Sequence, residues 1–319
     1  MKKTEAELLA GQWDVAAMRT DADTAGRMVL YEKDADKHVA RIIFNNPEQF
    51  NALTLAAVER VGDLVREAEV DDDVKVIIFK GRGPCFGAGA DAAELGHYIG
   101  YKSGVTAEER RRPSQRQRLL PDRNIVFGAF EHVIQECLKA TICQVHGYCY
   151  GGHFQIALAS DIVIATPEAM FTHPALRYLG PAPAGYLWLE NLGLKKWKEV
   201  TLTMRPVSAD EALQCGLINK IVPGDELEQW VEDYAQAIAV MPLDAIMMGK
   251  AMMQLVMEAR GKGVGGLSEV IGHAWCTNLR YEPGEWNFMK ERRGKGLSKA
   301  LHERDQMVAP FFRLGGRLK

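Results

Sequence analysis

Two glycine-rich turns are the features of this sequence best suited to support chemistry. The first lies in HGYCYGGHFQIALASD, residues 146–161, where two adjacent glycines precede an apolar run that is typical of a buried helix. Glycine lets a backbone approach a ligand closely because it has no Cβ. A helix N-terminus presents unpaired N–H groups and partial positive charge. Such a turn can stabilise an oxygen atom that gains negative charge during a reaction.

The second turn lies in GRGPCFGAGADAAEL, residues 81–95. It follows an apolar strand expected at 74–80 and precedes a helix expected to begin near Asp91. Two strand–turn–helix units can direct two backbone N–H groups at one oxygen. The alternative is that both turns are only tight connections between a strand and a helix.

Two further segments complete an ordered set of four motifs. FNNPEQFNAL, residues 44–53, and SADEALQCGLINKIVP, residues 208–223, match the opening motif and the later A-x-x-x-G-L-V segment of one family. The chain thus resembles the crotonase (enoyl-CoA hydratase/isomerase) superfamily from about residue 27 to about residue 301. The resemblance implies an α/β fold in which ββα units stack into a spiral core. A C-terminal helical region would then make the contacts of a homotrimer or a homohexamer.

We therefore expect an N-terminal extension at 1–26, a crotonase-like core at 27–223 and a helical region at 224–319. Within the core, residues 97–123 are charged, contain two prolines and show little periodicity. Two interpretations of this segment stay open: a solvated mobile loop, or a lid whose arginines contact a phosphorylated cofactor or an acidic substrate.

The elements that position the turns follow from hydrophobic periodicity. Strands at 28–31 and 39–44 form a hairpin, and a helix at 55–70 precedes the buried strand at 74–79. Further strands are expected at 141–145, 162–165 and 218–222, an extended segment at 169–172, and helices at 125–138, 194–204, 208–214, 225–240, 242–258 and over most of 261–301.

The resemblance implies that a thioester carbonyl is held by two backbone N–H groups while an enolate-like intermediate forms. Transferred to this sequence, the donors are the N–H groups of Ala90 and Gly152. The local pattern agrees, because Ala90 stands one residue before an expected helix and Gly152 lies at the start of another.

The acid and base residues depart from the hydratase pattern. A hydratase needs one carboxylate to activate water and another to deliver a proton, and these positions fall on Gln155 and Ala175. Neither side chain exchanges a proton at neutral pH, so the two-glutamate mechanism does not apply. Gln155 would orient substrate or water, and the small Ala175 leaves space for a bulky or cyclic acyl group.

Nearby histidines and tyrosines are the remaining candidates. His173 lies two residues before Ala175 in a segment expected to be extended, so both side chains would face one side. Histidine suits acid–base chemistry at neutral pH, but a hydrogen-bonded histidine at a domain or subunit contact is equally consistent. Two interpretations of Tyr150 and Tyr178 stay open: donors of hydrogen bonds to substrate, or buried aromatic residues with only a packing role. For His153, which replaces a third glycine, a capping or packing role is expected.

The phosphate-binding lysines of the family are replaced by Glu48 and Ala93. Arg82, the arginines at 110–112 or the basic run at 290–295 could substitute for them. Ala88 and Arg82 complete the expected substrate-binding residues.

Composition narrows the function classes. A net charge of −3 and a pI near 6.3 give no basic footprint for nucleic acid. The N-terminus has no apolar segment of a signal peptide, and no run approaches a membrane span. We therefore expect a cytoplasmic protein without membrane contact. The six scattered cysteines form no CxxC pair, and no metal or separate cofactor is expected.

The resulting hypothesis is a crotonase-family enzyme that stabilises the enolate or oxyanion of an acyl-CoA thioester, with CoA entering as part of the substrate. Two alternatives stay open: a CoA-independent hydrolase of a C–C bond in a β-diketone, and a catalytically silent paralogue.

Overall fold

The structure is a computed structural model that describes residues 22–92, 119, 123, 131–177, 185–275 and 279–311. Its larger sheet has the strand order β1-β2-β3-β4-β6-β9. β1 pairs antiparallel with β2, and every other neighbouring pair is parallel. The strands are β1 (Val29–Asp34), β2 (Val39–Phe44), β3 (Val76–Gly81), β4 (Ala140–Val145), β6 (Ile162–Ala165) and β9 (Lys220–Ile221).

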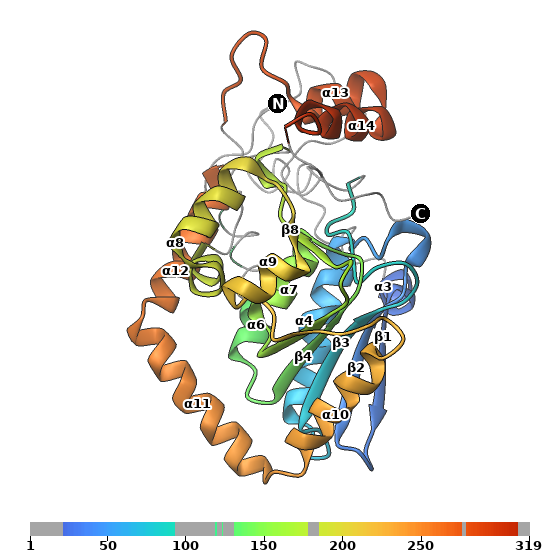
Figure 1. Cartoon of the computed structure of the whole chain (residues 1–319), viewed down its shortest axis with the longest axis vertical. Helices are drawn as coiled ribbons and strands as arrows, with labels where there is room; N and C mark the ends of the chain where they lie inside the picture. Colours follow the sequence, from blue (N-terminus) through green and yellow to red (C-terminus); the bar gives the residue numbers. More distant parts are fainter. Residues whose placement is uncertain are drawn as a thin grey trace, which may run out of the picture.

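Helices cover both faces of this sheet (Figure 1). α4 (Leu55–Val70) packs on one face with Ile77 and Phe79, and α10 (Leu227–Ala239) packs on the other with Val76 and Ile78. Alternate residues of β3 thus enter two apolar layers, because successive strand side chains point to opposite faces. Burial on both faces explains the unbroken apolar runs in the sequence.

A smaller sheet holds the two glycine-rich turns. It contains β5 (Tyr148–Tyr150), β7 (Met170–Thr172) and β8 (Val207–Ser208) in the order β5-β7-β8. The segment after β3 runs beside β5, since the Gly87 N–H donates to the Tyr148 carbonyl (2.8 Å) and the Tyr150 N–H donates to the Gly87 carbonyl (2.9 Å). β4 and β5 lead into α7 (Gly152–Ala159), which gives the strand–strand–helix order expected from the sequence.

The remaining helices lie around and beyond the sheets (Figure 1). α12 packs beside α8, α11 runs along the outside, and α13 and α14 form a small cluster with its own apolar centre at Phe288, Met289 and Ala300. These elements are α3 (Ala22–Met28), α6 (Glu131–Glu136), α8 (Gly185–Thr203), α9 (Ala209–Cys215), α11 (Leu243–Ala259), α12 (Lys262–Trp275), α13 (Phe288–Lys295), α14 (Leu297–Val308) and the 3-10 helices η1 (Pro47–Gln49) and η2 (Ala175–Arg177).

None of the described helices is, by itself, long and apolar enough to cross a membrane. α10 and α11 together have the length and composition of a broken span, with a bend of 99° between them. α10 places its apolar face on the sheet.

Several expected elements match the structure closely: the strands at 39–44 and 162–165, the helix at 55–70 and the first hairpin. The approach to the two glycines in the motif at 146–161, expected to be a turn, was wrong in part, because it contains β5. α8 begins at Gly185, earlier than expected, and breaks at Gly193 (φ 70°), close to the helix start expected at 194. The helix expected from Asp91 and most of the segment 97–123 lie outside the described residues.

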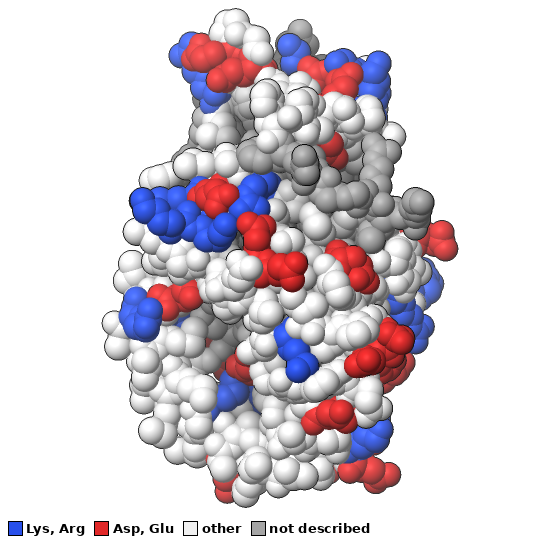
Figure 2. Space-filling model, in the orientation of Figure 1, with Lys and Arg blue, Asp and Glu red and all other residues white. Residues whose placement is uncertain are grey.

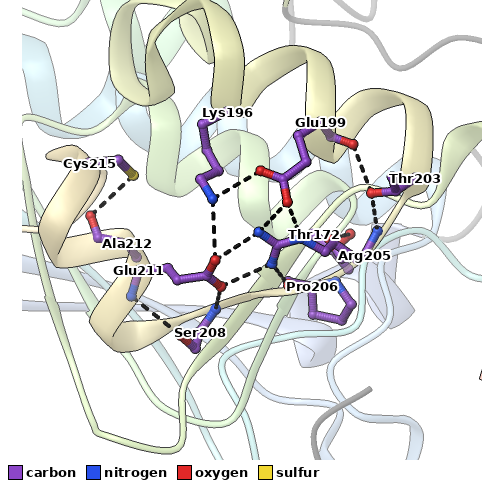
Figure 3. Close-up of polar contacts among 10 residues, drawn as sticks. All are labelled: Thr172, Lys196, Glu199, Thr203, Arg205, Pro206, Ser208, Glu211, Ala212 and Cys215. Atoms are coloured by element: carbon purple, nitrogen blue, oxygen red, sulfur yellow. Dashed lines mark hydrogen bonds and ion pairs between the residues drawn. The ribbon is translucent and has the colours of Figure 1, made fainter. Parts of the chain in front are cut away.

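An ion-pair network fastens the smaller sheet to α8 and α9 (Figure 3). Arg205 donates to both carboxylate oxygens of Glu211 (2.9 and 2.7 Å) and to Glu199 (2.7 Å). Ser208 and Glu211 form a capping box at the start of α9. The Thr172 hydroxyl donates to the Arg205 carbonyl (3.4 Å). The network therefore fixes the end of β7, the strand that leads to His173.

We expect Glu211→Gln to lower the free energy of unfolding by about 1–2 kcal/mol at pH 7, a value reduced for partial exposure. The Arg205 hydrogen bond lowers the pKa of Glu211 to about 2 from the ordinary 4.5. Because the folded pKa is depressed, this stabilisation exists above pH 4.5 and disappears as the pH falls toward 2. Urea unfolding from pH 7 to pH 2 measures it. The exposed Asp225→Asn is the control, and an unchanged gap between wild type and Glu211→Gln at low pH would contradict the assignment.

Candidate active site

The N–H group of Ala90 points away from its neighbouring strand. The Leu53 N–H donates to the Gly89 carbonyl (2.8 Å), and the Asp91 N–H donates to the Leu53 carbonyl (2.8 Å). Because successive peptide groups of an extended chain point to opposite sides, the intervening Ala90 N–H faces the side opposite Leu53. The Ala90 residue is exposed there.

The N–H group of Gly152 opens α7. The preceding Gly151 N–H donates to the Thr172 carbonyl (2.8 Å), whereas the first N–H groups of a helix have no partner within it. Within the described residues, neither the Ala90 N–H nor the Gly152 N–H donates a hydrogen bond to the backbone. Both groups are therefore available to an oxygen of a ligand.

The two turns touch backbone to backbone at Gly89 and Gly151. A Cβ on Gly89 would lie 2.9 Å from the Tyr150 carbonyl oxygen, and a Cβ on Gly151 would lie 3.2 Å from the Gly89 Cα and 3.9 Å from the Ala90 nitrogen. Both glycines also have positive φ, 95° and 55°, which other residues rarely adopt. The structure thus brings the Ala90 and Gly152 turns together, and their role as donors stays a prediction.

His153 holds the strand that leads to Ala90. Its Nδ1 accepts the Gly89 N–H (3.2 Å), so the neutral ring has its proton on Nε2. The ring is fully buried between Phe44 (4.5 Å) and Phe86 (5.5 Å). Burial lowers the pKa of His153 to about 3. The imidazole is therefore neutral across the physiological range and acts by packing and position.

The His153 ring occupies the space where a side chain of Gly87 would lie. A Cβ on Gly87 would be 2.1 Å from His153 Nε2. His153 stands where a third glycine would follow Gly151 and Gly152. Its ring leaves room only for a glycine at position 87 of the neighbouring segment.

The match between Gly87 and His153 can be measured with a double-mutant cycle. Gly87→Ala should lower stability by about 1–3 kcal/mol through overpacking, and His153→Ala by about 2–4 kcal/mol through a cavity and a lost hydrogen bond. The double variant should lose less than the sum, because the alanine methyl enters the space that the ring leaves. Urea unfolding gives the three values, and strict additivity would show that the two residues are independent.

The expected geometry around His173 was wrong. Ala175 begins η2, and its N–H donates to the His173 carbonyl (2.9 Å). The segment therefore turns, and extended alternation does not place His173 and Ala175 on one side. Pro174 explains the difference, because its fixed φ suits the first turn of a helix.

His173 lies in an apolar environment beside α8. Its ring packs edge-on against Trp188 (6.1 Å), which in turn contacts Phe154 (5.1 Å) on α7. Burial, followed by the charge of His273 on α12, lowers the pKa of His173 to about 4. Among the described residues, no hydrogen-bond partner reaches His173 Nδ1 or Trp188 Nε1. A neutral His173 is thus a weak base at neutral pH.

The other expected residues lie on several different elements. Gln155 is buried on α7 (6% exposed), Ala88 is exposed next to Gly87, and the Tyr150 ring packs on Tyr148 (4.8 Å). Arg82 instead pairs with Glu32 (3.4 Å) on β1, the edge strand of the larger sheet. Tyr178 and the arginines at 110–112 lie outside the described residues.

One contact links the second turn to α13, far along the chain. Arg292 on α13 donates to the Ala92 carbonyl (2.7 Å), so the basic run at 290–295 begins beside the second turn.

Glu131 on α6 and Glu269 on α12 form a buried carboxyl pair. The sequence analysis missed this pair, because a glutamate in an amphipathic helix is normally exposed.

The described part of the chain holds no group of three or more His, Cys, Asp or Glu residues arranged to bind a metal. Cys85, Cys137, Cys143 and Cys149 are buried free thiols, and Cys215 is a half-buried one.

Comparisons with known proteins agree with this architecture. A family model described as enoyl-CoA hydratase/isomerase matches residues 34–265. A relative from Mycobacterium tuberculosis, assigned provisionally as enoyl-CoA hydratase EchA13, is 29% identical over 250 residues, which cover 73% of this chain and 75% of the relative.

Solved structures give the same result. An enoyl-CoA hydratase from Mycobacterium smegmatis superposes with a TM-score of 0.77 and 27% identity over 91% of this chain and 97% of its own. An enoyl-CoA hydratase/isomerase from Xanthobacter autotrophicus Py2 superposes with a TM-score of 0.74 and 26% identity over 88% and 98% of the two chains. The expected spiral α/β fold is therefore confirmed.

Proposed function

Because this chain belongs to the enoyl-CoA hydratase/isomerase family, we propose that it stabilises the enolate of an acyl-CoA thioester between the N–H groups of Ala90 and Gly152. The observation that supports this most directly is the contact of Gly89 with Gly151, which brings two unused donors together. One donor of this kind lowers a barrier by about 2.7–4 kcal/mol.

The two-glutamate hydration mechanism of the family does not apply to this chain, since Gln155 and Ala175 stand where the two glutamates would be. The reaction would instead be an isomerisation or a bond cleavage that proceeds through the enolate. The small Ala175 favours a bulky or cyclic acyl group. The sequence offers His173, two residues before Ala175, as one candidate acid or base, with Gln155 orienting the substrate.

The basic helix α13 is the candidate site for the CoA phosphates. Arg292 anchors it to the Ala92 carbonyl, and Lys290 and Arg293 are exposed beside this contact. Figure 2 shows basic side chains, interspersed with acidic ones, at the end of the molecule that α13 and α14 form. These residues would replace the family's phosphate-binding lysines, whose positions hold Glu48 and Ala93 in this chain.

Gly152→Pro tests the oxyanion donors directly. Proline removes the N–H but is tolerated at the first position of a helix, so the variant should keep the circular dichroism of the wild type. In D2O, exchange of the α-protons of butyryl-CoA or phenylacetyl-CoA, followed by NMR, should fall about 100–1,000-fold. Gly152→Ala keeps the N–H and should exchange within tenfold of wild type. Wild-type exchange by a folded Gly152→Pro protein would contradict the assignment.

Calorimetric titration with CoA separates an acyl-CoA enzyme from a hydrolase of a free diketone. The hydrolase remains the second candidate because both glutamates are replaced. We expect CoA to bind, and Arg293→Glu to weaken the binding about tenfold, about 1.4 kcal/mol, while Lys195→Glu on α8 leaves it unchanged. If neither CoA nor an acyl-CoA binds to the wild type, the hydrolase becomes the better assignment.

An exposed apolar face on α11 and α12 favours a homo-oligomer. Within the described part of α11, the buried residue is Lys250, whereas the hydrophobic side chains face outward. Groups of exposed apolar side chains on neighbouring helices mark interaction surfaces. The face includes Met248, Met252, Leu255, Val256, Val264, Leu267 and Trp275. We propose that it forms the subunit contacts of a homotrimer or homohexamer, in a cytoplasmic protein.

Ultracentrifugation of the wild type at micromolar concentration should therefore give three or six subunits. Met252→Asp combined with Leu255→Asp should lower the mass toward that of one chain, because charges would enter the contact. Leu202→Asp, on an exposed part of α8, is the control. A monomeric wild type would exclude this assembly.

A further inference from the structure

Glu131 and Glu269 are buried side by side although both are acidic. Glu131 on α6 is 3% exposed and Glu269 on α12 is 9% exposed. Glu269 Oε1 accepts the N–H of Tyr186 at the start of α8 (3.4 Å), while neither carboxylate oxygen of Glu131 has a donor within the described residues. Two ionised carboxylates cannot hydrogen-bond to each other, but one shared proton turns the repulsion into a hydrogen bond.

The environment of the pair favours a shared proton. Burial, followed by the negative charge of Glu269, raises the pKa of Glu131 well above its ordinary value. An ionised, unpaired carboxylate in an apolar interior is strongly unfavourable. With one proton on the pair, one member is an acid and the other a base.

The pair lies on the side of the site where the family's carboxylates are missing. His273 follows Glu269 by four residues on α12, so the two share one helix face, and His273 is close enough to lower the pKa of His173. Tyr186, which contacts Glu269, lies on α8, the helix that also carries Trp188, and Trp188 packs on His173. Three helices thus bring the carboxyl groups toward the segment around Ala175.

Polar atoms without partners surround the same region. His173 Nδ1 and Trp188 Nε1 are both buried, and no hydrogen-bond partner in the described part of the chain reaches either. Buried polar groups are normally satisfied by protein, water or a ligand. Together with the Glu131–Glu269 pair, these atoms mark a place where a bound molecule would complete the hydrogen bonding.

We propose that Glu131 and Glu269 are the acid–base pair of this enzyme and perform the proton transfers that Gln155 and Ala175 cannot. This rests on the proposed enolate chemistry. The ionised carboxylate takes a proton from carbon, so a C–H bond breaks, an O–H bond forms, and the electron pair moves to the thioester oxygen held by Ala90 and Gly152. The protonated carboxyl then returns a proton to another carbon of the acyl group as the enolate collapses, and the charges balance.

Glutamine variants separate catalysis from structure, because glutamine keeps the shape and loses the proton. Glu131→Gln and Glu269→Gln should each lower α-proton exchange of phenylacetyl-CoA in D2O about 100–10,000-fold, with a melting temperature at or above that of wild type. The double variant should be no slower than the slower single variant, since the two groups act as a unit. Glu136→Gln is the matched control, because Glu136 lies on the same helix and pairs with Lys262; its exchange should stay within twofold.

The outcomes are distinct. If wild type, Glu131→Gln and Glu269→Gln all exchange at one rate, the inference is wrong and the oxyanion assignment stands. If the wild type exchanges neither phenylacetyl-CoA nor butyryl-CoA, the proposed function and the inference both fall. Infrared spectroscopy of the wild type at pH 7 should also show the C=O stretch of a protonated carboxylic acid, and its absence would overturn the shared proton without any variant.

Discussion

The contact between Gly89 and Gly151 is the constraint on which the rest of this site depends. It allows two peptide groups from turns far apart in sequence to lie within a few ångströms, at a distance that any side chain would prevent. The surrounding residues maintain that contact. His153 fills the space behind Gly87 and accepts the Gly89 N–H, and the Thr172 carbonyl accepts the Gly151 N–H. The Arg205 network then fixes β7, so the geometry is held by several independent interactions.

In the proposed reaction, charge stabilisation and proton transfer use different parts of the chain. The proposed oxyanion donors lie in two turns that backbone hydrogen bonds hold beside β5 and β7. The candidate proton-transfer groups come from α6 and from α12, whose position depends on the packing of α8. A change in the C-terminal helices can thus alter the proton transfer while the donors stay in place.

The sequence was most informative where a physical requirement is local. Positions 89 and 151 require glycine because their φ is positive and the two backbones approach closely. The run at 74–79 is apolar because the strand is buried on both faces. Both the turns and the central strand could therefore be predicted from the sequence. β5 was missed because three residues between two turns show no periodicity. The turn at Ala175 departs from the extended pattern before it, because Pro174 has a fixed φ that suits the first turn of a helix. The Glu131–Glu269 pair had no local signal at all, since 138 positions separate two glutamates that meet only in the folded chain.

Both proposed donors are main-chain atoms, and this has an evolutionary consequence. A substitution of Gln155, Ala175 or His173 changes a side chain but leaves the peptide groups of Ala90 and Gly152 intact. A lineage can therefore lose one set of acid–base residues and recruit another without passing through a form that cannot stabilise an enolate. Drift at the carboxylate positions is then tolerated, and new reactions become accessible on an unchanged scaffold.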